Sequence, residues 1–259
     1  MHTQPSHRKS LNPGQLQVLR LLYKYRFATT ELLAQYQEQK YKQVIYSRLK
    51  ILLEQEYLGQ NYDASYKLQG KQASYYLLTK GTNVLKEEHK FNPDILRASL
   101  KDRNASDRFI THSLNVFTIH NSFKALYPNE FKYFSESDLS SFDYFPKKLP
   151  NTYLSRIDVT SKQPKDYFVD SFEEITPFFV IINQIKQYIA YNKDEAWQKK
   201  TKRKFAVLLA VCDTATLEKR LKIQVAKSLP GDMKFYSCTE ERLANAVRLI
   251  DTAGLWQSN

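Results

Sequence analysis

Cysteine is scarce in this chain, because Cys212 and Cys238 are the only two among 259 residues. Two cysteines this far apart form no recognisable metal motif, and the five histidines show no ligand spacing either. Reduced thiols in a cytoplasmic protein are therefore expected, without a bound metal or other cofactor.

Long apolar runs are also missing. No stretch approaches the length of a membrane helix, and the polar N-terminal residues lack the apolar core of a signal peptide. We therefore expect neither secretion nor membrane insertion. Internal repeats and low-complexity tracts are absent as well. The length of the chain predicts two domains, each with its own core.

Acidic residues are too few to balance the basic ones, and the formal net charge is +12. The excess is largest in the first 100 residues, which hold 15 basic and 8 acidic side chains. A basic surface of this kind attracts phosphates, so nucleic acid is the first partner to consider.

The stretch from residue 11 to residue 85 has the pattern of a winged helix-turn-helix. Asn12 is a suitable N-cap, and Pro13 fits the first helical position because its missing N–H costs nothing there. Apolar spacing and turn residues then predict three helices, two strands and a fourth helix. The third helix covers residues 41–56, the strands cover 57–62 and 73–78, a polar loop covers 63–72, and the fourth helix starts at Thr79.

The third helix has one apolar and one polar face. Ile45, Leu49, Leu52 and Leu53 share the face that we expect in the core. The residues expected to contact DNA are Lys42, Gln43, Tyr46, Ser47 and Lys50 on the other face, with Lys67 and Lys71 in the loop between the strands. These side chains suit phosphates, and Gln43 could also pair with an adenine edge. A solvated helix face or a protein-contact surface is the alternative.

The second half alternates helices and strands. Its order is helix, three strands, helix, strand, helix, strand, helix, which predicts an α/β sandwich with a mixed sheet. Residues 205–211 form an apolar run typical of a strand buried on both faces. The expected organisation is therefore α+β, with a winged helix-turn-helix at 1–90, a linker at 91–104 that contains one helical piece at 93–100, and an α/β domain at 105–259.

Three acidic residues, Glu136, Asp158 and Asp170, fall at predicted strand positions. Carboxylates on neighbouring strands can hold Mg²⁺ for phosphodiester hydrolysis, and the element order matches a restriction-endonuclease-like core. Such nucleases place a lysine two residues after the second strand acid, where this chain has Phe172. Lys186 on the next helix is the alternative lysine. Without the expected lysine, the sequence favours a degenerate site over an enzyme.

The densest basic run covers residues 199–204 and contains five lysine or arginine side chains. We expect it in a loop before the strand at 205–211. A solvated loop is the simplest explanation, and a second contact with phosphates is the other.

Short motifs along most of the chain resemble those of the replication-relaxation family, which comprises accessory proteins of plasmid and mobile-element replication or transfer. They lie at residues 11–15, 19–22, 25–29, 48–50, 57–58, 75–81, 112–114, 136, 156–158, 167–170 and 185–188. The resemblance implies a winged helix joined to a restriction-endonuclease-like domain, and a role on DNA. Ile157 stands where the family often has proline before the strand acid.

The expected function is that of a DNA-binding accessory protein of a plasmid or other mobile element. Its partners would be double-stranded DNA and a relaxase or replication initiator, and a homodimer is a further expectation. One alternative is a Mg²⁺-dependent nuclease using Glu136, Asp158, Asp170 and Lys186. The other is a transcriptional repressor whose second half supplies the dimer interface.

Overall fold

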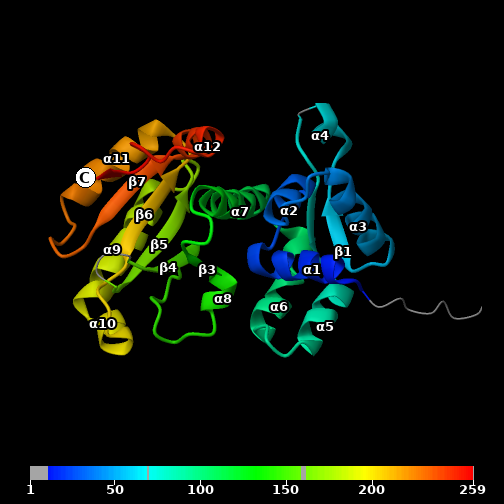
Figure 1. The fold of residues 1–259 in the computed structure, drawn as a ribbon, viewed down its shortest axis with the longest axis horizontal. Coiled ribbons are helices and arrows are strands. Elements are labelled where there is room, and N and C mark those ends of the chain that lie inside the picture. The colour runs from blue at the N-terminus through cyan, green and yellow to red at the C-terminus, as the bar shows by residue number, and fades with distance from the viewer. Residues whose placement is uncertain (1–10, 69, 159–161, 259) are drawn as a thin grey trace, which may run out of the picture. The chain divides into compact units, whose positions relative to one another are not determined.

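The computed structural model describes residues 11–68, 70–158 and 162–258, and no side-chain description covers Ala64 and Lys67. The chain divides into two compact units, which meet in sequence between Ala105 and Ser106. Both contain helices and strands, so the mixed α+β class predicted from the sequence is confirmed (Figure 1). No helix within the described ranges is long and apolar enough to cross a membrane.

The first unit contains a bundle of short helices and one hairpin. In chain order its elements are α1 (Pro13–Tyr25), α2 (Thr30–Tyr36), α3 (Lys42–Glu54), β1 (Leu58–Asn61), α4 (Ala64–Leu68), β2 (Ser74–Leu77), α5 (Thr79–Glu87), α6 (Pro93–Ser99) and the 3₁₀ helix Asp102–Asn104. Three helices followed by a hairpin and a return helix are compatible with a winged helix-turn-helix.

The helix starts follow from their caps. Asn12 accepts the Gln15 backbone N–H while the Gln15 side chain accepts the Asn12 N–H, which forms a capping box with Pro13 at the first helical position. Thr29 caps α2 through the Leu32 N–H. Ala28, in the predicted break between these helices, pairs with Tyr75 of β2 and so adds a bridge to the hairpin.

One segment differs from its predicted form. The loop between the hairpin strands contains the short helix α4, whose polar residues show no helical periodicity that would have predicted it. The helical piece predicted at residues 93–100 is present as α6, which packs against α1 and α5, and the 3₁₀ helix follows it.

The second unit is built on a six-stranded mixed sheet. Its elements are α7 (Asp107–Leu126), β3 (Lys132–Ser135), α8 (Glu136–Leu139), β4 (Thr152–Ile157), β5 (Pro164–Phe172), α9 (Phe178–Lys193), α10 (Ala196–Thr201), β6 (Val207–Cys212), α11 (Ala215–Ala226), β7 (Phe235–Thr239), α12 (Glu240–Leu249) and β8 (Gln257–Ser258). The strands lie in the order β3-β4-β5-β6-β7-β8. Neighbours from β5 to β7 are parallel, and the other pairs are antiparallel.

Helices cover both faces of this sheet, and alternate side chains of the strands serve the two cores. Phe168 and Leu208 point to the core formed with α9, α10 and α11. Val169 and Leu209 point to the opposite core, formed with α7 and α12. Every residue of β6 is buried, so the predicted strand with two buried faces is confirmed.

Candidate functional site

The outer face of α3 carries all five of its predicted DNA-contacting residues. Ile45 and Leu49 are fully buried, whereas each of the five side chains is exposed; they are Lys42, Gln43, Tyr46, Ser47 and Lys50. The helical period produces this division, because residues three and four apart share a face. An exposed helix with such side chains fits the width of the DNA major groove.

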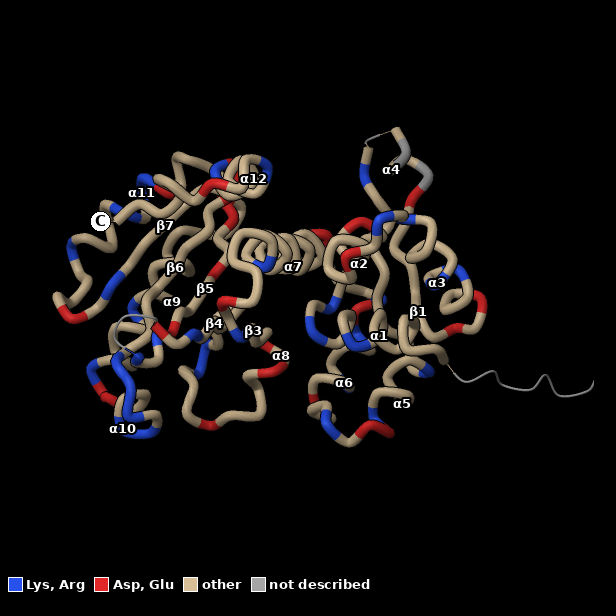
Figure 2. Tube along the Cα trace, in the orientation of Figure 1, with Lys and Arg blue, Asp and Glu red and all other residues tan. Residues whose placement is uncertain are grey.

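Two lysines on this face of α3 form ion pairs with acidic residues of the same unit. The Glu31 carboxylate on α2 accepts the Lys42 ammonium at 2.9 Å and the Gln72 amide at 2.7 Å. These hydrogen bonds lower the pKa of Glu31, so the carboxylate stays charged beside α3. Lys50 lies 3.9 Å from Glu54 in an exposed pair, and Glu54 is the one acidic residue of α3 (Figure 2).

The connection between β1 and β2 carries the other two predicted residues. Lys71 is exposed, and its ammonium lies 5.6 Å from the centre of the Tyr66 ring. Gly70 has a positive φ of 64°, which turns the chain just before Lys71. Lys67 belongs to α4, and its side chain lies outside the described part of the structure.

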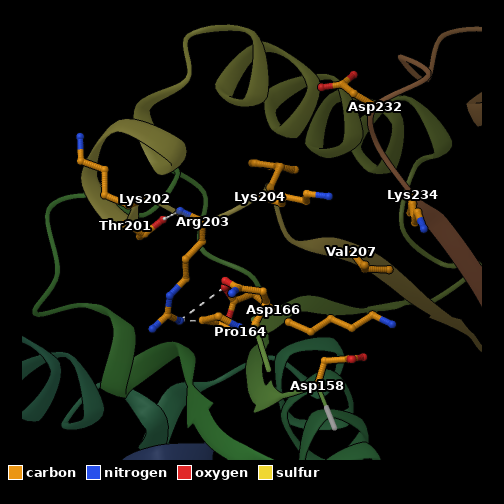
Figure 3. Close-up of a pocket in the computed structure, with 13 residues that line it drawn as sticks. Asp158, Pro164, Asp166, Thr201, Lys202, Arg203, Lys204, Val207, Asp232 and Lys234 are labelled. Carbon is orange, nitrogen blue, oxygen red and sulfur yellow. Dashed lines mark hydrogen bonds and ion pairs between the residues drawn. The ribbon is translucent and has the colours of Figure 1, made fainter. Parts of the chain in front are cut away.

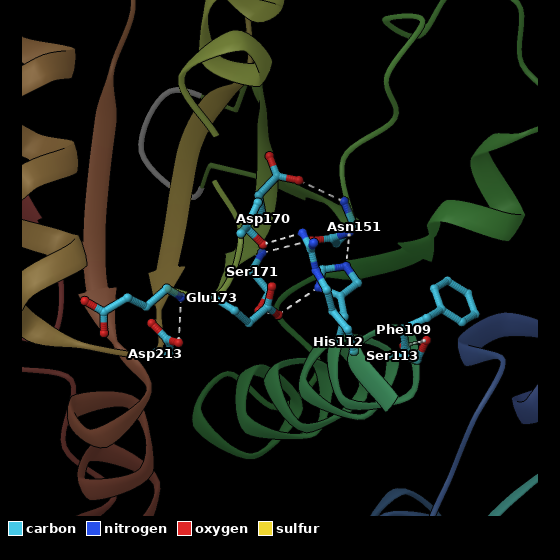
Figure 4. Close-up of polar contacts among 11 residues, drawn as sticks. Phe109, His112, Ser113, Asn151, Asp170, Ser171, Glu173 and Asp213 are labelled. Atoms are coloured by element: carbon cyan, nitrogen blue, oxygen red, sulfur yellow. Dashed lines mark hydrogen bonds and ion pairs between the residues drawn. The ribbon is translucent and has the colours of Figure 1, made fainter. Parts of the chain in front are cut away.

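A buried polar network occupies the end of β5 in the second unit (Figure 4). The Asp170 carboxylate accepts the Asn151 backbone N–H at 3.1 Å and the Tyr188 hydroxyl at 2.8 Å. Burial raises the pKa of Asp170 to about 6, although both hydrogen bonds and the positive charge of Lys148 oppose the shift.

Asn151 joins this carboxylate to a histidine on α7. The Asn151 side-chain oxygen accepts the Ser171 N–H at 2.9 Å, which turns the amide nitrogen toward His112 Nε2 at 3.2 Å. His112 Nε2 must then be the acceptor, so Nδ1 carries the proton and donates to Glu173 at 2.7 Å. In the neutral form of the ring, the amide thus selects the tautomer with the proton on Nδ1. A cavity of about 340 Å³ adjoins His112 and Glu173.

The structure does not bring the four predicted nuclease residues together. β4 and β5 are antiparallel, with Ile157 opposite Pro164. Asp158, directly after β4, therefore lies near the start of β5, whereas Asp170 lies six residues further along that strand, about 20 Å away at 3.3 Å per residue.

The other two predicted nuclease residues also differ from expectation. Glu136 was expected on a strand but is the first residue of α8, because Ser135 caps that helix in a capping box with Asp138. Its charge still acts on Asp170, whose pKa it helps to raise. Lys186 is exposed on α9, and Phe172 is buried in the core. Lys148, not Lys186, is the lysine whose charge acts on Asp170.

Acidic residues also gather at the carboxyl ends of the parallel strands. Glu173, Asp213 and Glu240 follow β5, β6 and β7, and the carboxylates of Asp213 and Glu173 add to burial in raising the pKa of Glu240. Across the described residues, no group of three or more His, Cys, Asp or Glu side chains is arranged to hold a metal ion.

Sequence reasoning missed Asn151, His112 and Glu173 as one network. His112 was noted only as part of a motif, and Asn151 stands just before a predicted strand. The signal that could have located them is the short β4–β5 connection, because a hairpin places the residue before β4 beside the end of β5.

The chain is thus a two-unit α+β protein, with a basic helix–hairpin unit ahead of a mixed α/β sheet. Residues 19–126 match the model of the family described as Replication-relaxation, which confirms the predicted family over this stretch. The match begins within α1 and ends with α7. No curated protein matches the chain. The family suggests a role in the replication or transfer of mobile elements.

Proposed function

We propose that the chain is an accessory protein of mobile-element replication or transfer that docks on duplex DNA through α3. The contacts would come from Lys42, Gln43, Tyr46, Ser47 and Lys50, with Lys67 and Lys71 of the β1–β2 connection reaching the backbone. The lysines supply affinity for phosphates, and Gln43 is the side chain suited to an adenine edge.

One observation carries this proposal: the face of α3 opposite its buried residues exposes five side chains that donate hydrogen bonds or carry positive charge. In another packing of α3, these five side chains would have been buried in the core or against a neighbouring strand. Instead α3 packs on α1, α2 and β1 through its apolar side. A basic family member with a helix presented in this way has the features that DNA recognition requires.

The test is binding of the full chain to duplex DNA, measured by fluorescence anisotropy across a salt series with random-sequence and plasmid-origin fragments. Gln43→Ala/Lys50→Ala should lower affinity at least tenfold, and loss of the Lys50 contact should reduce the salt slope by about 0.9. The matched control is Asn83→Ala/Lys86→Ala on α5, which removes the same groups from another exposed helix.

Equal loss in the control variant would show a general charge effect and contradict the assignment to α3. Absence of binding even at low salt would make this unit a protein-contact module. Protection of two half-sites separated by one helical turn, about 34–36 Å, would instead point to a dimeric repressor. Protection of a single site near an origin supports the accessory role.

Phosphodiester hydrolysis is not proposed, because Asp158 and Asp170 lie at opposite ends of β5 and Phe172 fills the position of the expected lysine. Including Mg²⁺ in the binding reactions tests this point directly. Cleavage that disappears in Asp170→Asn would restore the nuclease alternative.

A further inference from the structure

A second basic site lies in the other unit, at the amino-terminal ends of β5, β6 and β7. A cavity of about 850 Å³ opens there between the start of β5, the segment after α10 and the turn before β7 (Figure 3). Nothing in the α3 interface involves this cavity, because all its lining residues belong to the second unit.

Basic side chains outnumber acidic ones around the cavity. The basic residues are Lys165, Lys202, Arg203, Lys204 and Lys234, and the acidic ones are Asp158, Asp166 and Asp232. Arg203 pairs with Asp166 at 3.3 Å. The Asp166 carboxylate also accepts the hydroxyls of Tyr153 and Ser155, both at 2.7 Å, so it is engaged within the wall.

The four lysines differ from Arg203 in this respect. Within the described ranges, none of their ammonium groups has a carboxylate within 4 Å. The Asp232 carboxylate accepts the Asn192 amide at 2.9 Å, and Asp158 is the third acidic residue of the lining. Because five basic side chains face three acidic ones, the lining keeps a net positive charge, which attracts an anion.

The backbone that carries three of these basic residues is held in place. Lys202 ends α10 with a positive φ of 58°, and the Arg203 N–H donates to the Thr201 hydroxyl. The indole N–H of the buried Trp197 donates to the Lys204 carbonyl at 3.1 Å. Binding would thus require little ordering of the chain.

We propose that this cavity binds the backbone phosphates of a nucleic-acid strand, as a second contact independent of α3. The lysines come from three separate segments around an open mouth, and in Figure 3 the side chains of Lys202 and Lys234 lie far apart. Such spacing suits a row of phosphates better than a single one, because each strand carries one charge per about 3.4 Å of helix axis. The choice of nucleic acid as the phosphate source rests on the proposed function.

A tryptophan beside the cavity allows the site to be tested in the full chain. Trp197 and Trp256 are the only tryptophans, and both lie in the second unit. In a Trp256→Phe background, Trp197 reports on the cavity through its bond to the Lys204 carbonyl, which alanine at 204 would retain. The ligands are a 20-nucleotide single strand, a 20-base-pair duplex, adenosine monophosphate and inorganic phosphate.

A saturable, salt-sensitive change in Trp197 emission is expected with the oligonucleotides. Lys202→Ala/Lys204→Ala/Lys234→Ala should weaken this binding at least tenfold and lower the salt slope by about 2–3, one contact per lysine. The control Lys132→Ala/Lys219→Ala/Lys227→Ala removes the same charge from β3 and from α11 and its C-cap, and should leave the change intact.

Three results would overturn the proposal: no Trp197 response to either oligonucleotide, an equal loss in the control variant, or equal affinity for adenosine monophosphate or inorganic phosphate. The last result would assign the cavity to a small phosphate ligand. The variant Gln43→Ala/Lys50→Ala separates the two sites. DNA binding that is detected by anisotropy and depends on α3, without any Trp197 response, would agree with the proposed function. It would contradict only the inference of a second binding site in the cavity.

Discussion

Asp170 is a buried acid whose proton affinity links pH to the stability of the second unit. Burial raises the pKa of Asp170 to about 6 from its usual 3.8, so the folded chain binds this proton more tightly than the unfolded chain. The contribution to stability is complete below the usual value and is lost as pH rises through about 6. At 1.36 kcal/mol per pH unit, the loss amounts to about 3 kcal/mol.

Replacing Asp170 by asparagine should remove this dependence. The free energy of unfolding in urea, followed by the fluorescence of the two tryptophans of the second unit, should fall between pH 4 and pH 7 in the wild type and stay flatter in Asp170→Asn. The exposed Asp194→Asn is the control and should keep the wild-type slope. A slope unchanged by Asp170→Asn would show that other groups govern the pH response.

Arg26 and Asp102 form the most buried ion pair of the first unit among its described residues. The guanidinium contacts the carboxylate at 2.6 and 2.9 Å and donates to the Ala98 carbonyl, and Asp102 is only 3% exposed. Burial is the largest effect on Asp102 and raises its pKa despite Arg26. Removing the arginine would leave a buried carboxylate without its counter-ion.

Arg26→Ala should therefore destabilise α1 by about 3 kcal/mol, the usual cost of breaking a buried pair from one side. Hydrogen exchange of the α1 amides, measured by mass spectrometry, gives the free energy of opening. The control Arg97→Ala removes an arginine from the exposed pair with Asp94. It should change the free energy of opening by less than about 0.5 kcal/mol. Similar effects in both variants would refute the structural role of Arg26.

At the scale of elements, Glu31 ties α2 to α3 and to the segment before β2 through Lys42 and Gln72. Its negative charge also opposes the approach of phosphates to α3. Glu31→Gln keeps the size and one acceptor oxygen while removing the charge. We expect a several-fold gain in duplex affinity at low salt, which shrinks as salt screens the interaction.

The matched control for this gain is Glu87→Gln, which neutralises an exposed acid on α5. Both variants are compared in the anisotropy assay at 50 and 200 mM salt. A gain in both would reflect net charge alone. No gain in Glu31→Gln would place Lys42 outside the interface.

Elements with strong periodicity were predictable from the sequence, and contacts between distant segments were not. The third helix, predicted at 41–56, is α3 at Lys42–Glu54. Its apolar spacing identifies the helix and its buried face, but does not determine the exact residues at which the helix begins and ends. α4 was missed, since five residues of a polar loop carry no period. Asp158 and Asp170 were predicted in one site because each falls at a strand position, but the sequence does not give the register between the two strands. In the antiparallel pair of β4 and β5, this register places Asp158 far from Asp170 and brings Asn151 to Asp170 instead.

At the scale of the whole molecule, the division after Ala105 decides which fragment can fold alone. The predicted domain ended at residue 90, but α6 packs on α1 and α5, and Asp102 pairs with Arg26. A fragment that ends at Lys90 lacks these partners and leaves apolar surface of α1 and α5 exposed. A fragment that ends at Ala105 keeps them.

We therefore expect the fragment 1–105 to unfold cooperatively at a higher temperature than 1–90, with a difference of at least about 10 °C. A loss of roughly 3 kcal/mol alone corresponds to such a shift in a domain of this size. Circular dichroism melting of both fragments measures the difference. Arg26→Ala in 1–105 should lower its melting temperature toward that of 1–90, because it breaks one of the contacts that truncation removes. Equal melting temperatures for the two fragments would mean that residues 91–105 add nothing to the stability of the first unit.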